Sequence, residues 1–459
     1  MLEIYKNLFT CFHDRGIQYC SWKNNHSLAY ALSGDGDVDL LVSSTQFKKF
    51  ETIAFKNNFI RVKSSISEYP FVQHYYCYDK RSNKFGHLHV YYKLVTGDSH
   101  LKNYRLPVED KVLNASRVSD FGIREAHPSH QADLYMLRKY IKSSSLLGLF
   151  LLFRESEDYK GEFNYIKGEI AELGEKIAPS LFKFDVGFSK PLSFVNLLKI
   201  KRYIKVWHRG VGVIKRVSQL KTRILNKLFF HRRKIVNGSV IAVVGLDGSG
   251  KSSAVEMLSK WLSKEFTIKI FHFGRPPATL LTYPIRIMLW VRRVVFLKNA
   301  SGSLVDSSNN KLSLISKIRY LALAFERVVL MRNAHRFSLN GGIAILDRYP
   351  SNNIGKMDSQ RIPDSNSFFG RLESTLYESM KIADMLLKFN VDVEEAVRRN
   401  SSRIKKDKET DEEIRIRFKI NDRLQYSSLL EHEIDAMQPK DEVHKQLKVL
   451  VWEYIVATN

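Results

Sequence analysis

Apolar runs and helical stretches alternate over the second half of the chain. Four apolar runs of strand length occupy residues 239–245, 267–273, 341–347 and 383–391, and stretches with helical spacing, such as SAVEMLSKWL, lie between them. Parallel strands need a crossover connection, usually a helix, so this order is typical of a parallel sheet with helices packed on it. The pattern therefore predicts an α/β domain over residues 237–459.

The first part of the chain has a mixed pattern. Residues 17–42 predict a strand, a helix and a second strand, and residues 129–142 have the spacing of a helix. These elements indicate a separate α/β module with a helical tail over residues 1–180.

A strongly basic segment lies between the two predicted domains. Residues 186–246 contain 14 Lys or Arg and no Asp or Glu, and apolar residues recur among them at roughly helical spacing. The pattern predicts one or two basic amphipathic helices over residues 186–236. Two interpretations stay open: a solvated connector, or a surface that docks onto anionic lipid or another polyanion.

Composition limits the number of domains, the partners and the cysteine chemistry that the chain can have. The chain has 459 residues, of which 44% are apolar and 12% aromatic, enough for two or three folded domains. Its net charge of +25 suggests a polyanionic neighbour, without choosing among nucleic acid, an acidic membrane surface and phosphorylated substrates. Three cysteines without a C-x-x-C pair argue against a disulfide framework and leave a thiolate zinc site unsupported.

Targeting signals are not evident in the sequence. The first residues lack the basic-then-apolar order of a signal peptide, and no window has the roughly 18 uninterrupted apolar residues that a membrane span needs. We therefore expect a cytoplasmic protein, with peripheral contact at the inner face of a membrane as an open alternative. There is no firm signal for nucleic-acid binding.

A glycine-rich loop follows the first predicted strand of the second domain. Residues 245–252 read GLDGSGKS and match G-x-x-x-x-G-K-[ST] in full, between an apolar strand and a helix. Such glycines let successive backbone N–H groups face a phosphate, the lysine reaches the β- and γ-phosphates, and the serine hydroxyl binds Mg²⁺. The loop predicts a site for ATP and Mg²⁺, formed by Gly245, Gly248, Ser249, Gly250, Lys251, Ser252 and Ser253.

A charged pair ends a later strand. The run GGIAILDRYP places Asp347 and Arg348 directly after apolar residues. Ligands of open parallel sheets bind at the carboxyl ends of the strands, so we expect Asp347 to face the same crevice as the loop. A carboxylate there can hold a Mg²⁺-bound water or accept a proton, and Arg348 can bind an acceptor phosphate in a bidentate manner.

Residues 237–459 resemble thymidylate kinase and related nucleoside monophosphate kinases. The loop matches that family's G-x-[DE]-x-x-G-K-[ST] pattern, and DRYPS resembles its D-R-[YFH] motif. The resemblance implies a three-layer P-loop kinase domain, with Asp247 contacting the acceptor sugar and Arg327 contacting the acceptor phosphate. It also implies a lid entered at Arg399 and containing Arg403, which would stabilise the transferring phosphoryl group because Gly248 stands where some members place a catalytic arginine. Members of this kind often pair through helices, so a homodimer is left open.

The acceptor side departs from that family. Residues 350–364 lack the Tyr-Gln pair that helps to hold thymidine, and the second phosphate loop survives only as GRPPAT, with Arg275 but no acidic residue. An extra segment, residues 266–305, carries six Lys or Arg and no acid. The donor side is therefore the better supported half of the predicted site, and the acceptor stays open.

The first domain carries a second candidate site. Asp37 and Asp39 stand two residues apart on a predicted strand, so both face one side, where paired carboxylates can hold Mg²⁺. With Ser21 in an earlier turn, this arrangement resembles the nucleotidyltransferase fold. The strand expected to carry a third carboxylate offers His87 and His89 instead. Three interpretations stay open: a degenerate domain that binds without chemistry, an active nucleotidyltransferase, and an unrelated acidic turn.

Three functions follow from these motifs. The first is an ATP- and Mg²⁺-dependent kinase whose nearest acceptor by resemblance is a nucleoside monophosphate such as dTMP. The second is a phosphotransferase that acts on a phosphorylated or glycan acceptor near a membrane surface. The third is a nucleotide-binding regulator that does not turn over.

Overall fold

The computed structural model divides into two compact units, Met1–Arg233 and Lys234–Thr458. It describes residues 1–64, 68–69, 71–97, 102–143, 156–173, 179–182, 202, 204–208, 233–296, 312–401, 410–421 and 423–459. The predicted connector helices of residues 186–236 lie mostly outside these residues. Within the described part of that segment are a short 3₁₀ helix, η3 (Lys205–Trp207), and the strand β10 (Arg233–Ile235) at the boundary of the two units.

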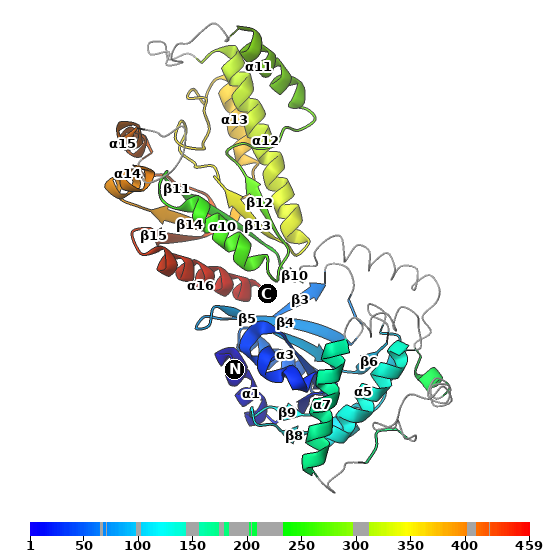
Figure 1. Ribbon diagram of the computed structural model, residues 1–459. Coiled ribbons are helices and arrows are strands. Elements are labelled where there is room, and N and C mark those ends of the chain that lie inside the picture. Colours follow the sequence, from blue (N-terminus) through cyan, green and yellow to red (C-terminus); the bar gives the residue numbers. More distant parts are fainter. Residues whose placement is uncertain are drawn as a thin grey trace. The chain divides into compact units, whose positions relative to one another are not determined.

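The second unit is built on a sheet whose strands all run parallel (Figure 1). Their order is β12-β13-β11-β14-β15. The bounds are β11 (Ser239–Gly245), β12 (Ile268–His272), β13 (Ile343–Asp347), β14 (Ala383–Asn390) and β15 (Ser428–Asp435). The first four fall on the four predicted apolar runs. The sequence pattern does not predict β15, because its residues are largely exposed and three of the eight residues in SLLEHEID are acidic.

Helices cover both faces of this sheet, which makes three layers (Figure 1). One face is packed by Leu330, Met331 and Ala334 of α12 against Val240 and Ala242 of β11. On the other face, α10 lies beside α16. The helices are α10 (Lys251–Leu262), α11 (Tyr283–Phe296), α12 (Leu314–Leu339), α13 (Phe368–Glu378), α14 (Val393–Ser401), α15 (Asp411–Ile420) and α16 (Lys440–Thr458). The predicted α/β fold class is confirmed.

The first unit is also α/β. Its sheet contains strands in the order β3-β4-β5-β2-β1-β9-β8. They are β1 (Tyr19–Ser21), β2 (Asp37–Val42), β3 (Ile60–Ser64), β4 (Val72–Asp79), β5 (Lys84–Tyr91), β8 (Arg117–Val118) and β9 (Arg124–Glu125), with a separate hairpin of β6 (Leu94–Thr96) and β7 (Tyr104–Leu106). The predicted strand, helix and strand of residues 17–42 are β1, the helical turns η1 (Asn25–Ser27), α2 (Leu28–Tyr30) and η2 (Ala31–Asp35), and β2.

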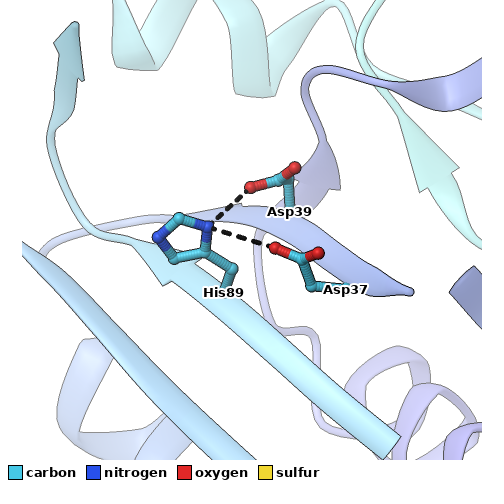
Figure 2. A group of neighbouring side chains, drawn as sticks. All are labelled: Asp37, Asp39 and His89. Atoms are coloured by element: carbon cyan, nitrogen blue, oxygen red, sulfur yellow. Dashed lines mark ion pairs between the residues drawn. The ribbon is translucent and has the colours of Figure 1, made fainter. Parts of the chain in front are cut away.

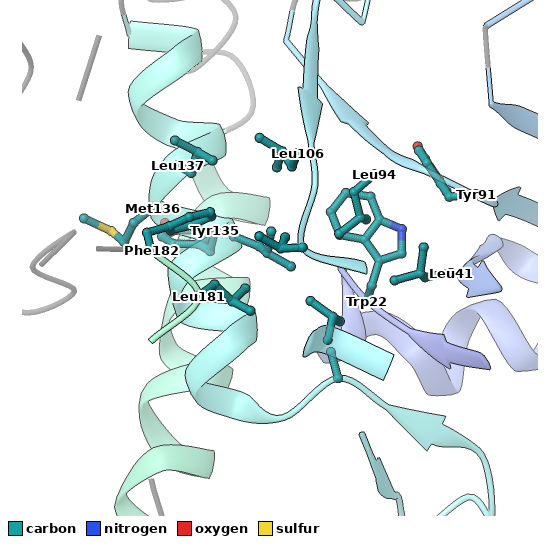
Figure 3. Close-up of a cluster of buried hydrophobic side chains, with 14 of the residues drawn as sticks. Trp22, Leu41, Tyr91, Leu94, Leu106, Tyr135, Met136, Leu137, Leu181 and Phe182 are labelled. Carbon is teal, nitrogen blue, oxygen red and sulfur yellow. The ribbon is translucent and has the colours of Figure 1, made fainter. Parts of the chain in front are cut away.

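Two apolar cores hold this unit together. One lies under α1 (Glu3–Asp14) and α3 (Phe47–Lys56) and buries residues such as Phe12 and Phe50. The other brings Trp22, Leu41 and Tyr91 against α5 (Pro128–Ser143), as Figure 3 shows. The remaining helices of the unit are α4 (Glu109–Asn114) and α7 (Ser156–Leu173). The second core matters for the site below. Trp22 is followed in the sequence by Lys23, whose ammonium lies over the Trp22 ring and reaches the predicted carboxylate of Asp39.

Candidate functional site

The glycine-rich loop joins the central strand β11 to the start of α10. Gly245, Gly248 and Gly250 all have positive φ angles, of 147°, 85° and 94°. Side chains at the first two positions would collide with their surroundings: a Cβ at Gly245 would lie 2.7 Å from the carbonyl oxygen of Phe389, and one at Gly248 would lie 3.0 Å from the Cβ of Ala396. The loop is therefore curled in the way that lets successive N–H groups point to one place.

One polar atom in this loop lacks a partner. The side chain of Ser249 is buried, with 1% of the residue exposed. Its Oγ makes no hydrogen bond with any other residue in the part of the chain that the structure describes. Buried hydroxyls are nearly always hydrogen-bonded, so an anion held by the loop would supply what the protein does not. Ser252 and Ser253 follow in the first turn of α10, whose N-terminus also favours an anion.

Lys251 lies in the same turn and is buried. Its Nζ donates a hydrogen bond to the carbonyl oxygen of Leu246 at 2.6 Å and stands 3.7 Å from the carboxylate of Asp247. Burial lowers the pKa of Lys251, and the negative charge of Asp247 opposes that shift. The donor set of the loop, with one ammonium, one buried hydroxyl and glycine amides, fits the phosphates of ATP, and the Ser252 hydroxyl fits Mg²⁺.

A cavity of about 590 Å³ opens beside the loop. It is lined by Ser249, Gly250 and Ser253 on one side and by Arg399 and the turn after β15, Ala436–Pro439, on the other. Arg399 is fixed there, because its guanidinium donates to the carbonyl oxygen of Ala436 at 2.6 Å and to Glu395 at 2.7 Å. Three of the predicted donor residues, Ser249, Gly250 and Ser253, therefore share one hollow with Arg399, and it has room for a purine base.

Asp347 ends β13, as predicted, and it has a partner that the sequence analysis missed. Its Oδ2 lies 2.6 Å from Nδ1 of His272, the last residue of the neighbouring strand β12. The negative charge of Asp347 also reaches Lys251 and opposes the lowering of that lysine's pKa. Asp347 and His272 therefore end their strands at the same edge of the sheet as the loop that carries Lys251. Parallel strand order could have revealed His272, because the carboxyl ends of adjacent parallel strands meet at one edge.

Arg348 and Arg275, two of the three arginines that the sequence predicts for the acceptor, differ in their surroundings. Arg348 has a φ of 59°, unusual for a residue with a side chain, and its Cδ fills the space above Gly274, where a Cβ would come within 2.5 Å. Arg275 is exposed. Both follow strand ends: Arg348 comes directly after β13, and Arg275 comes three residues after β12.

Arg327 is almost fully buried, at 3% exposed, in α12. Its guanidinium donates to the carbonyl oxygens of Phe273 and Asp358, at 3.1 and 3.0 Å, and to the hydroxyl of Tyr377 at 2.7 Å. The Asp358 carboxylate lies 3.7 Å from another nitrogen of the same group. Burial raises the pKa of Asp358, against the opposing charges of Arg327 and Arg348. No sequence signal marked Asp358, which lies in the irregular segment 350–364.

The lid side of the loop is described in part. Asp247, predicted to contact the acceptor sugar, forms an ion pair of 3.2 Å with Arg417 of α15. The sequence analysis did not predict this arginine. The predicted lid arginine, Arg403, lies outside the described residues.

The first unit brings Asp37, Asp39 and His89 together, as Figure 2 shows. The Nδ1 of His89 lies 2.9 Å from the carboxylate of Asp39 and 3.7 Å from that of Asp37. The three residues each offer a ligand atom within 4.8 Å of the others, so together they could hold a metal ion. His87, the other predicted histidine, instead contacts His74, with ring nitrogens 3.0 Å apart.

A lysine already neutralises this site. The Nζ of Lys23 lies 2.9 Å from Asp39, over the rings of Trp22 and Tyr91. Burial alone would raise the pKa of Asp39, but Lys23 and His89 outweigh it and hold that pKa below its ordinary value. His89 lowers the pKa of Asp37 to about 2. The donor set fits a divalent cation, which would have to compete with the ammonium of Lys23 for Asp39.

Comparison with known proteins gives little beyond the fold. No protein-family model matches the chain, and no curated protein does. Among the solved structures that match, two are similar over about half of the chain. Thymidylate kinase from Candida albicans is 18% identical, with a TM-score of 0.29, covering 48% of this chain and 93% of that one. The structure titled "Crystal structure of APE1195" is 15% identical, with a TM-score of 0.26, covering 49% and 98%. Function is therefore argued from the residues described above.

Proposed function

We propose that the second unit is an ATP- and Mg²⁺-dependent phosphotransferase. The observation that carries this proposal is the loop of residues 245–252, in which the buried hydroxyl of Ser249 lacks a partner and the ammonium of Lys251 is buried beside curled glycine backbone. ATP supplies the transferable γ-phosphoryl group, and Mg²⁺ neutralises part of its charge. Lys251 would bind the β- and γ-phosphates, and Ser252 would bind the metal. Arg399 would line the side of the cavity that receives the base.

The acceptor would bind where β12 and β13 end. Asp347 and Arg348 lie there, and Arg275 is exposed close by in the sequence. The resemblance of the sequence makes a nucleoside monophosphate such as dTMP the first acceptor to test. Positioning and electrostatic stabilisation account for most phosphoryl-transfer catalysis, so these charges would act on the transferring group without forming bonds to it.

The test is ADP production by the full chain with ATP, Mg²⁺ and a panel of nucleoside monophosphates. We expect turnover in the wild type and a loss of at least about 100-fold in Lys251→Ala, because the variant lacks the ammonium that meets the transferring phosphoryl group. ADP production without phosphorylation of any nucleotide would contradict a nucleotide acceptor, but it would be consistent with a phosphotransferase that has another acceptor. ATP binding by a wild type that never turns over would instead favour a nucleotide-binding regulator.

A second candidate, a phosphotransferase at a membrane surface, is favoured by α11. This helix and the loop before it expose large apolar side chains, including Leu280 at 94% and Trp290 at 64%. The segment around them is basic and free of acids from residue 266 to 305. Among the described residues no helix is long and apolar enough to cross a bilayer. Sedimentation with anionic vesicles tests the candidate, and absence of binding at low salt would contradict it.

A further inference from the structure

His272 and Asp347 form a dyad at the edge of the sheet where the acceptor would bind. They are the last residues of β12 and β13 and are paired in register. Their contact of 2.6 Å joins Nδ1 of the imidazole to Oδ2 of the carboxylate. Since a carboxylate is an acceptor, the hydrogen bond places the proton of a neutral imidazole on Nδ1. The lone pair is then on Nε2, the nitrogen that can take up a proton.

That second nitrogen is accessible. The side chain of His272 is 44% exposed, and its Nε2 makes no hydrogen bond with a described residue. Gly274 adjoins this nitrogen, since a Cβ built there would lie 3.5 Å from Nε2, but the Cδ of Arg348 occupies that place, 2.5 Å from the same Cβ position. An acceptor group would therefore reach Nε2 from the exposed side of the imidazole.

The dyad stands at the same end of the sheet as the glycine-rich loop. In the sheet β13 lies between β12 and β11, with Asp347 level with His272 on one side and with Val243 on the other. The glycine-rich loop begins two residues beyond Val243. The charge of Asp347 reaches the ammonium of Lys251 across this distance. An acceptor held by His272 would thus lie at the end of the sheet that carries the loop.

We propose that His272 is a general base and that the acceptor group of this enzyme is an alcohol hydroxyl, as in a sugar or polyol, rather than a phosphate. This inference rests on the proposed phosphotransferase function. A phosphate acceptor is largely ionised at neutral pH, so its oxygen attacks without help from a base. A hydroxyl holds its proton until the transition state, and a positioned base typically accelerates such a step 10²–10⁴-fold.

The buried arginine supports the same choice. Arg327, which the resemblance assigns to an acceptor phosphate, donates its hydrogen bonds to Phe273, Asp358 and Tyr377. The carboxylate of Asp358 lies 3.7 Å from this guanidinium and would repel a dianionic phosphate. A neutral hydroxyl acceptor meets no such repulsion and leaves the network intact.

The step balances with the groups named. The acceptor O–H bond breaks, and its proton passes to Nε2 of His272. The oxygen forms a bond to the γ-phosphorus of ATP, while the bond from that phosphorus to the bridging oxygen breaks and its electron pair leaves with ADP. Asp347 stabilises the imidazolium through the 2.6 Å contact, and the proton is then lost to water.

The experiment compares four forms of the full chain: wild type, His272→Ala, Lys251→Ala and His335→Gln. The last is a matched control, because His335 is a half-buried histidine of α12 that contacts the carbonyl oxygen of Ile382. Each form is first tested for binding of a fluorescent ADP analogue. Transfer from γ-labelled ATP is then measured with N-acetylglucosamine, glycerol and thymidine as hydroxyl probes and with dTMP and dGMP as phosphate probes. Water, present throughout, is a further hydroxyl probe, read as released phosphate.

We expect wild type and His335→Gln to label hydroxyls or water. His272→Ala should bind the ADP analogue as the wild type does, with kcat reduced about 100-fold and KM little changed, and added imidazole should restore part of the rate. A purely structural role for the histidine would not give that rescue. Label found only on the phosphate of dTMP or dGMP, or an unchanged kcat in His272→Ala, would overturn the proposal. A wild type that binds the ADP analogue without any turnover would overturn the proposed phosphotransferase function.

Discussion

Gly248 shows how a single position excludes an alternative mechanism. Some kinases of the family that the sequence resembles carry an arginine at this place in the loop. Here the backbone has a φ of 85°, and a Cβ would lie 3.0 Å from the Cβ of Ala396 and 3.1 Å from that residue's carbonyl oxygen. An arginine would therefore displace α14, which holds Arg399. A catalytic arginine would have to come from outside the loop.

We predict that Gly248→Arg lowers both stability and turnover instead of adding a catalytic group. Left-handed backbone at a residue with a side chain costs about 1–3 kcal/mol, and the contact with Ala396 adds to it. Urea unfolding measures the first effect and ADP production the second. Gly250→Ala is the control for stability, because it has a φ of 94° but open space around the added Cβ, so it should lose less. Higher turnover in Gly248→Arg would show that the loop has room for the arginine.

At the scale of elements, the sequence located the glycine-rich loop and the end of β13, but not the partners that distant segments bring to the candidate sites. The loop residues and Asp347 could be located because their motif and the strand pattern are local in the sequence. His272, Asp358 and Lys23 could not be assigned in this way, since each acquires its partner from a segment distant in the chain. Residues 350–364 have no periodic pattern, so nothing predicted that Asp358 would lie against Arg327.

The role of the exposed face of α11 can be tested separately from that of the rest of the unit. Arg286 and the preceding Thr282 attach this helix to the body of the unit, because they donate to Glu326 at 2.9 and 2.6 Å. Glu326 directly precedes Arg327, so the helix is attached close to the acceptor side. A membrane-bound face there would bring the acceptor side towards molecules held in the bilayer.

We predict that replacing Leu280, Leu281 and Trp290 together by serine lowers binding of the full chain to anionic vesicles at least about tenfold. Burying one such side chain stabilises binding by about 1.5–3 kcal/mol, and about 1.4 kcal/mol corresponds to a factor of ten. Leu339→Ser is the matched control, because that residue is 80% exposed at the end of α12. Equal vesicle binding by the triple variant would show that other basic segments make the membrane contact. Self-association of the wild type in sedimentation velocity would instead show that a second copy of the chain covers these apolar side chains.

At the scale of the whole molecule, two units carry two separate sets of charged groups. The described cores around α1, α5 and β11 each draw their residues from one unit. The carboxylates of Asp37 and Asp39 belong to the first unit, and the glycine-rich loop belongs to the second. Ligand binding to one unit should therefore mainly suppress local unfolding within that same unit.

Hydrogen exchange in the presence and absence of ADP tests this division in the full chain. We predict slower exchange in β11, α10 and the turn after β15, because ADP would bind the loop and the adjoining cavity and stabilise the unit by mass action. Strands β2 and β5, which carry Asp37 and His89, should exchange at unchanged rates. Lys251→Ala should abolish the protection without altering exchange in the first unit. Protection that spreads into β2 and β5 would mean that the two units bind and respond as one, and that the carboxylates of the first unit act on the nucleotide of the second.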